Sequence, residues 1–180
     1  LTSALVHTPT PGRLRIRRKL GKRSGLKEGD GVADVGAGPG LFSWPLAEAV
    51  GPTGKVYAAD TNRSVLSYLR FAAARKRGLN VQPHPCDAKD VKLPAGTVNV
   101  AFVIQTYHAM LSADPDAQLW FKEELLPWLT SIRRALRAGG RLVVQDRRDR
   151  TAPATQRRHL GTVGFRHPRT ERLAETQFLA

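Results

Sequence analysis

The sequence predicts an α/β protein with a doubly wound, mostly parallel sheet flanked by helices. Two observations support this prediction. From residue 26 onward, short apolar strands alternate with segments of helical periodicity, and glycine or proline residues mark the turns between them. The strands are nearly continuous apolar runs, as expected when helices cover both faces of a parallel sheet.

The elements can be placed in order along the chain. A first strand at 32–35 leads through a glycine-rich turn at 36–40 into a helix at 42–50, which Gly51-Pro52 ends. A second strand at 56–60 is followed by a helix at 65–73, closed by Gly78. A weaker, proline-interrupted strand covers 81–85, and a strong strand covers 98–105. Another helix, begun or kinked at Pro127, ends before Gly139-Gly140, and a fifth strand covers 141–146.

The pattern weakens after the fifth strand. Residues 151–162 predict a short helix or a loop, and Phe165 with residues 173–180 predicts one late strand or an incomplete hairpin. No seventh strand is evident. We therefore expect a basic N-terminal extension at 1–25 and one domain at 26–180, with its core at 26–146.

Positive charge is concentrated toward the two ends of the 180-residue chain. Twenty-nine Lys and Arg residues against fifteen Asp and Glu give a formal net charge of +14. The excess lies in residues 13–27 and 133–172, whereas residues 28–132 are slightly acidic. The basic ends indicate nucleic acid or another polyanion as a partner, or they form an ordinary solvated surface. The sequence leaves both interpretations open.

Several classes of protein are excluded by composition. Apolar residues make up 41% of the chain, enough for a buried core. The single cysteine, Cys86, excludes an internal disulfide framework and a cysteine-based zinc cluster, and the five histidines lack metal-ligand spacing, so we expect no metal. The longest apolar run, 98–104, is too short to cross a bilayer, and we expect no membrane partner and a cytoplasmic location. The oligomeric state is not predicted.

Candidate ligand-binding residues follow three successive strands. Gly36, Gly38 and Gly40 form a turn after the first strand, where a ligand can approach the backbone closely. Asp60 ends the second strand, where a carboxylate can accept hydrogen bonds from ribose hydroxyls, and Asp87 lies just past the third. Ligands of open parallel sheets bind beyond the carboxyl ends of the strands. These residues therefore predict one nucleoside-type ligand.

The chain resembles the class I S-adenosylmethionine-dependent methyltransferases, which have a Rossmann-like fold, over roughly residues 26–146. Residues 32–40 (VADVGAGPG) resemble that family's first motif, 56–60 (VYAAD) its second and 86–88 (CDA) its adenine-contacting segment. Residues 98–108 resemble the fourth-strand segment, and 137–144 resemble the approach to the fifth strand. Thr106-Tyr107-His108 is similar to the TYHH segment of small bacterial methyltransferases, with Ala109 in place of the second histidine.

The resemblance implies S-adenosylmethionine as cofactor and a role for each matching residue. Asp34 would lie near the methionine amino group, and Gln105, which stands where Asp or Asn is frequent, would lie near the sulfonium. The remaining implied cofactor contacts are the turn residues Gly36, Ala37, Gly38 and Gly40, the ribose-side Asp60 and Thr61, and the adenine-side Asp87 and Ala88.

His108 is the candidate catalytic residue. An imidazole has a pKa near neutrality and can remove a proton from a methyl acceptor. Alternatively, His108 only caps the end of the fourth strand through a backbone hydrogen bond.

The leading hypothesis is a methyltransferase that transfers a methyl group by in-line displacement to a small-molecule acceptor. The alternatives are a nucleic-acid methyltransferase, such as one acting on RNA and recruited by the basic ends, and a non-catalytic S-adenosylmethionine-binding module.

Overall fold

A computed structural model describes residues 24–76, 78–110, 121–147, 152–166, 171–174 and 177–179. Side-chain surroundings are described up to residue 166, except for Arg147. Most of the expected N-terminal extension lies outside the described residues. No helix in the described part of the chain combines the length and the apolar character needed to cross a membrane.

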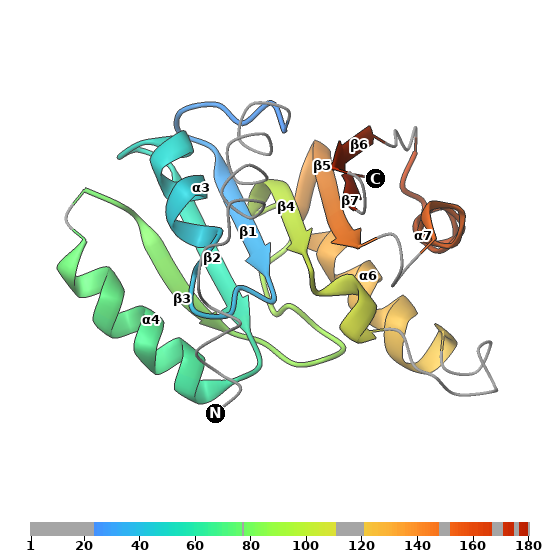
Figure 1. The fold of residues 1–180 in the computed structure, drawn as a ribbon, viewed down its shortest axis with the longest axis horizontal. Coiled ribbons are helices and arrows are strands. Elements are labelled where there is room, and N and C mark those ends of the chain that lie inside the picture. The colour runs from blue at the N-terminus through green and yellow to red at the C-terminus, as the bar shows by residue number, and fades with distance from the viewer. Residues whose placement is uncertain are drawn as a thin grey trace.

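The described strands form one sheet of seven (Figure 1). Its spatial order is β3 (Val81–Pro85), β2 (Lys55–Asp60), β1 (Gly31–Val35), β4 (Val98–Ile104), β5 (Leu136–Arg147), β7 (Gln177–Leu179) and β6 (Glu171–Ala174). Strands β1 to β5 pair in parallel, which confirms the predicted fold class, and the chain reverses its strand order at β1 and β4. Such a switch point is where an open α/β sheet binds its ligand.

Helices cover both faces of the sheet (Figure 1). The helices α3 (Ser43–Val50) and α4 (Arg63–Arg75) bury Leu46, Leu66 and Leu69 against one face. The helices α6 (Leu126–Ala135) and α7 (Pro153–Thr162) bury Leu129 and Leu160 against the other. Two short turns, η1 (Tyr107–Met110) and η2 (Phe121–Leu125), follow β4 and precede α6.

Capping residues and prolines explain where several helices begin and why one strand lies at the edge of the sheet. Asn62 caps α4, because its side-chain oxygen accepts hydrogen bonds from the backbone N–H groups of Ser64 (2.9 Å) and Val65 (3.3 Å). Pro127 lies in the first turn of α6, where a missing N–H costs nothing, so it begins the helix rather than kinking it. The prolines of β3 are tolerated because β3 is an edge strand of the described sheet, where it pairs with β2.

Near the C-terminus the structure has the helix and the hairpin, each of which was one of the alternatives left open by the sequence, and it departs from the expectation in the number of strands. Residues 153–162 form a helix, and both a sixth and a seventh strand are present. Strand β7 pairs antiparallel with β5 and with β6, so the late residues extend the sheet. The expectation that no seventh strand is present was therefore wrong, because β6 and β7 are short strands whose pairing depends on distant β5.

Candidate functional site

The carboxyl end of β1 carries a buried acid, Asp34. Only 2% of this residue is exposed, and Asp34 Oδ2 accepts a hydrogen bond from Ser43 Oγ at 2.6 Å. Burial raises the pKa of Asp34 from 3.8 to about 6; the Ser43 hydrogen bond opposes this effect and the nearby Asp60 carboxylate adds to it. The site therefore carries a carboxyl that titrates close to neutrality, a common property of ligand-binding clefts.

The glycine turn joins Asp34 to α3, and the surroundings of its three glycines differ. Gly36 (φ 75°) lies against Thr106, whose side chain a Cβ at Gly36 would overlap. Among the described residues, no heavy atom lies within 4 Å of the position that a Cβ at Gly38 (φ 53°) would take, so with respect to them this part of the turn is open. A Cβ at Gly40 would lie 2.8 Å from Trp44 and Leu69 side-chain atoms, so Gly40 serves helix packing.

Asp60 fixes this turn from the end of β2. Its Oδ2 accepts from the Gly38 backbone N–H at 2.9 Å, and its Oδ1 accepts from the Asn62 N–H at 2.8 Å. The backbone N–H groups of Gly36 and Ala37 both donate to the Ala59 carbonyl, at 2.9 and 3.0 Å. Two carboxylate oxygens offer about four acceptor positions, so a diol can still donate to Asp60. Together with the open space at Gly38, these acceptor oxygens fit the sugar hydroxyls of a nucleoside cofactor.

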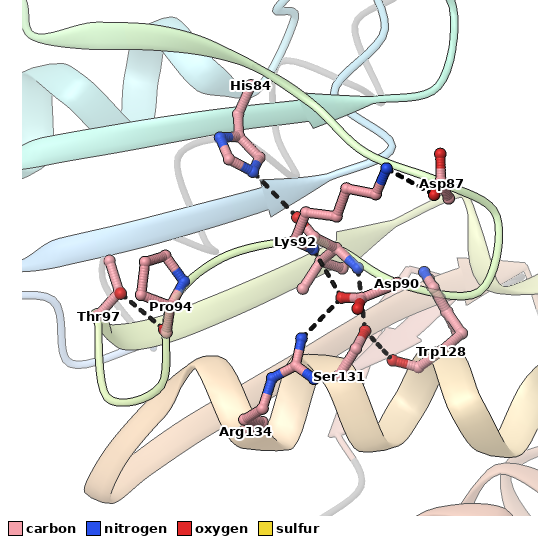
Figure 2. A network of polar contacts seen from close by, with 10 residues as sticks. His84, Asp87, Asp90, Lys92, Pro94, Thr97, Trp128, Ser131 and Arg134 are labelled. Carbon is pink, nitrogen blue, oxygen red and sulfur yellow. Dashed lines mark hydrogen bonds and ion pairs between the residues drawn. The ribbon is translucent and has the colours of Figure 1, made fainter.

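Asp87 and Ala88 lie in the exposed segment that follows β3 (Figure 2). Asp87 Oδ2 lies 2.6 Å from Lys92 Nζ, and this contact raises the pKa of Lys92. The same segment is tied to α6, because Ser131 Oγ accepts from the Val91 N–H at 3.0 Å and Arg134 contacts Asp90 at 2.8 Å. These contacts with α6 give the segment after β3 a defined position.

Gln105 begins the turn that leads from β4 into η1. It adopts a left-handed conformation (φ 52°), uncommon for a residue with a side chain, and its N–H donates to the Gln145 carbonyl at 2.7 Å. Such backbone strain is often found at ligand sites. Thr106, the next residue, contacts the Gly36 carbonyl at 3.4 Å, so the β4 turn and the glycine turn touch.

His108 is held by a buried carboxylate at the end of β5. The Nδ1 atom of His108 lies 2.9 and 3.0 Å from the two Asp146 oxygens, and the His108 backbone N–H donates to Asp146 Oδ2 at 2.7 Å. Asp146 is fully buried, whereas 23% of the His108 side chain is exposed. A carboxylate beside Nδ1 favours the tautomer with its proton on Nδ1, which leaves Nε2 as a base.

Tyr107 packs behind this pair. Its ring is fully buried beside Trp128, and its hydroxyl lies 3.0 Å from His159 Nδ1 of α7. Burial raises the pKa of Tyr107 and, with Arg158 nearby, lowers that of His159. This neutral pair connects η1 to α7. One turn before His159, the amide of Gln156 is fully buried with no hydrogen-bond partner among the described residues.

The predicted site residues therefore fall into three groups. The residues at the ends of β1, β2 and β4 gather at the switch point: Asp34, Gly36, Ala37, Gly38, Asp60, Gln105 and His108. Asp87, Ala88 and Thr61 lie in exposed segments just beyond strand ends, and Gly40 faces the core. No group of three metal-ligating side chains occurs among the residues described.

Sequence reasoning missed two partners of these residues, Ser43 and Asp146. Asp146 carried a usable signal, since it ends the fifth strand as Asp60 ends the second. Ser43 carried none beyond its place at the start of a helix.

Comparisons with known proteins agree with this geometry. The profile of a methyltransferase domain family matches residues 26–165. The chain is 31% identical over 128 residues to the ubiquinone/menaquinone biosynthesis C-methyltransferase UbiE of Cellvibrio japonicus, covering 68% of this chain and 45% of that protein. It is 33% identical over 127 residues to the enzyme of the same name from Ectopseudomonas mendocina, covering 68% and 44%. The chain thus spans less than half the length of these relatives.

A solved structure extends the comparison to the fold. A SAM-dependent methyltransferase from Aquifex aeolicus superposes with a TM-score of 0.77 and 27% identity, covering 94% of this chain and 91% of that one.

Proposed function

The chain belongs to the S-adenosylmethionine-dependent methyltransferase family, and we propose that it methylates a small molecule whose acceptor atom loses a proton. The observation that carries this proposal is the pair formed by His108 and the buried Asp146 at the ends of β4 and β5. A partly exposed imidazole fixed by a carboxylate is a typical arrangement for a general base.

The cofactor would be held by the residues around the glycine turn. S-adenosylmethionine, when bound, supplies a methyl group on a positively charged sulfur. Asp60 would accept from the ribose hydroxyls, the backbone at Gly38 would allow close approach, and Asp34 would face the positively charged amino group. Asp87 and Ala88 would lie on the adenine side, as the sequence resemblance implies.

His108 would remove the acceptor's proton as the acceptor bonds to the methyl group. The proton goes to Nε2, and the positive charge that develops on the imidazole is stabilised by Asp146, 2.9 Å from Nδ1. General bases contribute about 10²- to 10⁴-fold in rate. Asp146 acts as a positioning residue, because it fixes both the ring and the backbone N–H of His108.

The class of acceptor is inferred from the base and from the relatives. A base is needed only where the acceptor carries a proton to lose, as a phenol or an activated ring carbon does. The curated relatives are named as C-methyltransferases of quinone biosynthesis. We therefore expect a phenolic or quinol-like small molecule, methylated at carbon or oxygen.

The test uses a panel of substituted phenols and reduced quinones with methyl-labelled cofactor. We expect His108→Ala to lower kcat at least 100-fold while its affinity for S-adenosylhomocysteine stays within about twofold, because the base does not hold the cofactor. Asp146→Asn should lower kcat at least tenfold and alter the acidic limb of the pH profile. Tyr68→Ala is the control, since Tyr68 is exposed on α4 and is not one of the candidate site residues.

Two results would contradict the proposal. Unchanged turnover in His108→Ala would remove the base from the mechanism. Saturable cofactor binding without methyl transfer to any acceptor would instead favour a non-catalytic binding module.

A further inference from the structure

A groove lies at the amino ends of β1, β4 and β5, on the sheet edge opposite the candidate active site. Its volume is about 530 Å³. Its lining comes from the segment before β1, from the start of β4, and from the first part of β5. The lining residues are Gly25, Lys27, Asp30, Asn99 and residues 137–141. Nothing in the candidate methyl-transfer site uses these residues.

An irregularity in β5 shapes one wall of the groove. Val98 of β4 is paired with Leu136, but Val100 is paired with Arg141, so the register shifts between them. Residues 137–140 therefore lie opposite a single residue of β4 and bulge from the sheet. Gly139, with φ 73°, allows this bend. The bulge places two arginines, Arg137 and Arg141, on the groove wall.

Backbone carbonyls hold both guanidinium groups in place. Arg137 Nε donates to the Gly96 carbonyl at 3.2 Å, and Arg141 Nη2 donates to the Gly25 carbonyl at 2.9 Å. A guanidinium has five N–H donors, so one such contact orients the group and leaves donors for an anion. Gly25 permits this contact, because a Cβ there would lie 2.6 Å from Arg141 Nη1.

The charge of the groove favours an anionic ligand. Lys27, Arg137 and Arg141 are exposed cations, against one carboxylate, Asp30, whose Oδ2 already accepts from the Lys27 backbone N–H at 2.8 Å. Asn99 accepts from the Gly31 N–H through Oδ1 at 2.9 Å, so its amide N–H groups add donors at the same wall. Lys27 ends one of the two basic segments of the sequence, and the two arginines belong to the other.

We propose that this groove is a phosphate-binding site. Paired, oriented guanidinium groups match the geometry of phosphate oxygens and can bind them through two parallel hydrogen bonds. The phosphate belongs either to a nucleic-acid strand or to a small phosphorylated compound, and both present the same oxygens. Because the groove lies at the amino edge of the sheet, phosphate binding there leaves the carboxyl edge free for cofactor and acceptor. The inference is therefore independent of the proposed methyl transfer.

The test measures binding of two probes to the full chain: a fluorescein-labelled single-stranded RNA 20-mer, by anisotropy between 50 and 200 mM salt, and pyrophosphate, by calorimetry. Arg137→Glu should weaken binding at least tenfold. Arg70→Glu, an equal charge change at an exposed position on α4, should change binding less than twofold. Thermal melting of both variants checks that they fold.

Each outcome decides the proposal. RNA binding that depends on Arg137 and is far tighter than pyrophosphate binding supports a nucleic-acid strand as the source, and its salt dependence should be steep. Equal, Arg137-dependent binding of both probes supports a small phosphorylated compound. Failure of both probes to bind, or equal loss in Arg137→Glu and Arg70→Glu, overturns the phosphate site.

Discussion

Asp34 predicts that cofactor binding weakens in mildly acidic solution. Its burial raises its pKa from 3.8 to about 6. If the ionised carboxylate faces the cofactor's ammonium group, binding at low pH must first remove a proton from Asp34. The pKa of Asp34 lies about one unit above pH 5 and about one unit below pH 7. The dissociation constant should therefore be roughly tenfold larger at pH 5 than at pH 7, a difference of about 1.4 kcal/mol in binding free energy.

The raised pKa of Asp34 also predicts how the stability of the ligand-free protein changes with pH. The folded pKa lies above the unfolded one, so the folded chain binds more protons between pH 4 and 6, and stability is lost as pH rises through that window. Over this window the free energy of unfolding falls by roughly 3 kcal/mol in total. Asp34→Asn removes the buried charge but keeps an oxygen for the Ser43 hydroxyl. At pH 7 it should therefore raise the melting temperature by several degrees while weakening cofactor binding.

The assay is calorimetric titration of S-adenosylhomocysteine at pH 5, 6, 7 and 8, with thermal melting alongside. Wild type should show the roughly tenfold change, and Asp34→Asn should bind weakly without it. Asp60→Ala is the control: it should bind more weakly at every pH, by roughly 1.5–3 kcal/mol, and keep a pH dependence whose midpoint moves to lower pH, because the Asp60 carboxylate helps raise the pKa of Asp34. A flat wild-type profile, or an undiminished slope in Asp34→Asn, would refute the reasoning.

The other predictions concern the glycine turn and the η1–α7 contact. Gly38→Ala should weaken S-adenosylhomocysteine binding at least tenfold by calorimetry, because its Cβ enters the open space at the turn that the cofactor would approach. The same variant should lose little in melting temperature, because the Cβ meets no described atom. Gly36→Ala should instead lower the melting temperature strongly, because its Cβ overlaps Thr106; equal melting of the two variants would contradict this distinction. Tyr107→Phe should cost about 1–2 kcal/mol in chemical denaturation, since it leaves the buried His159 Nδ1 without its 3.0 Å partner. Unchanged stability would show that the hydroxyl contributes nothing.

The five parallel strands could be predicted because their signals are local. Val98–Ile104 is apolar at every position except Asn99 and is bounded by turn residues, so its burial follows from its composition. The pairing of β7 with β5 could not be predicted in this way. Residues 177–179 form a strand of only three residues, and what places them is the free edge of β5, more than thirty positions earlier in the sequence.

The same distinction between local signals and long-range contacts applies to the residues of the candidate site. Asp34 and Asp60 were predictable because a carboxylate at the end of a strand and a glycine turn are both visible in the sequence. The partner of His108 was not, because Asp146 lies 38 residues away and meets it only after β4 and β5 pair. The sequence identified the imidazole, whereas its tautomer and orientation follow from the tertiary structure.

Two buried acids at the carboxyl edge argue that this edge binds ligand rather than merely closing the sheet. Asp34 is 2% exposed and Asp146 is fully buried, and burying a carboxylate costs free energy unless partners compensate for lost water. Both Asp146 oxygens lie within hydrogen-bond distance of His108 Nδ1, so its charge can orient the imidazole and stabilise it when it carries a second proton. Asp34 accepts a hydrogen bond from Ser43, but its pKa is still raised to about 6. This one hydrogen bond therefore does not compensate fully for the burial of the carboxylate. A neutral Asn would accept from Ser43 at lower desolvation cost, so we predict that the carboxylate at position 34 faces a cation when the site is occupied.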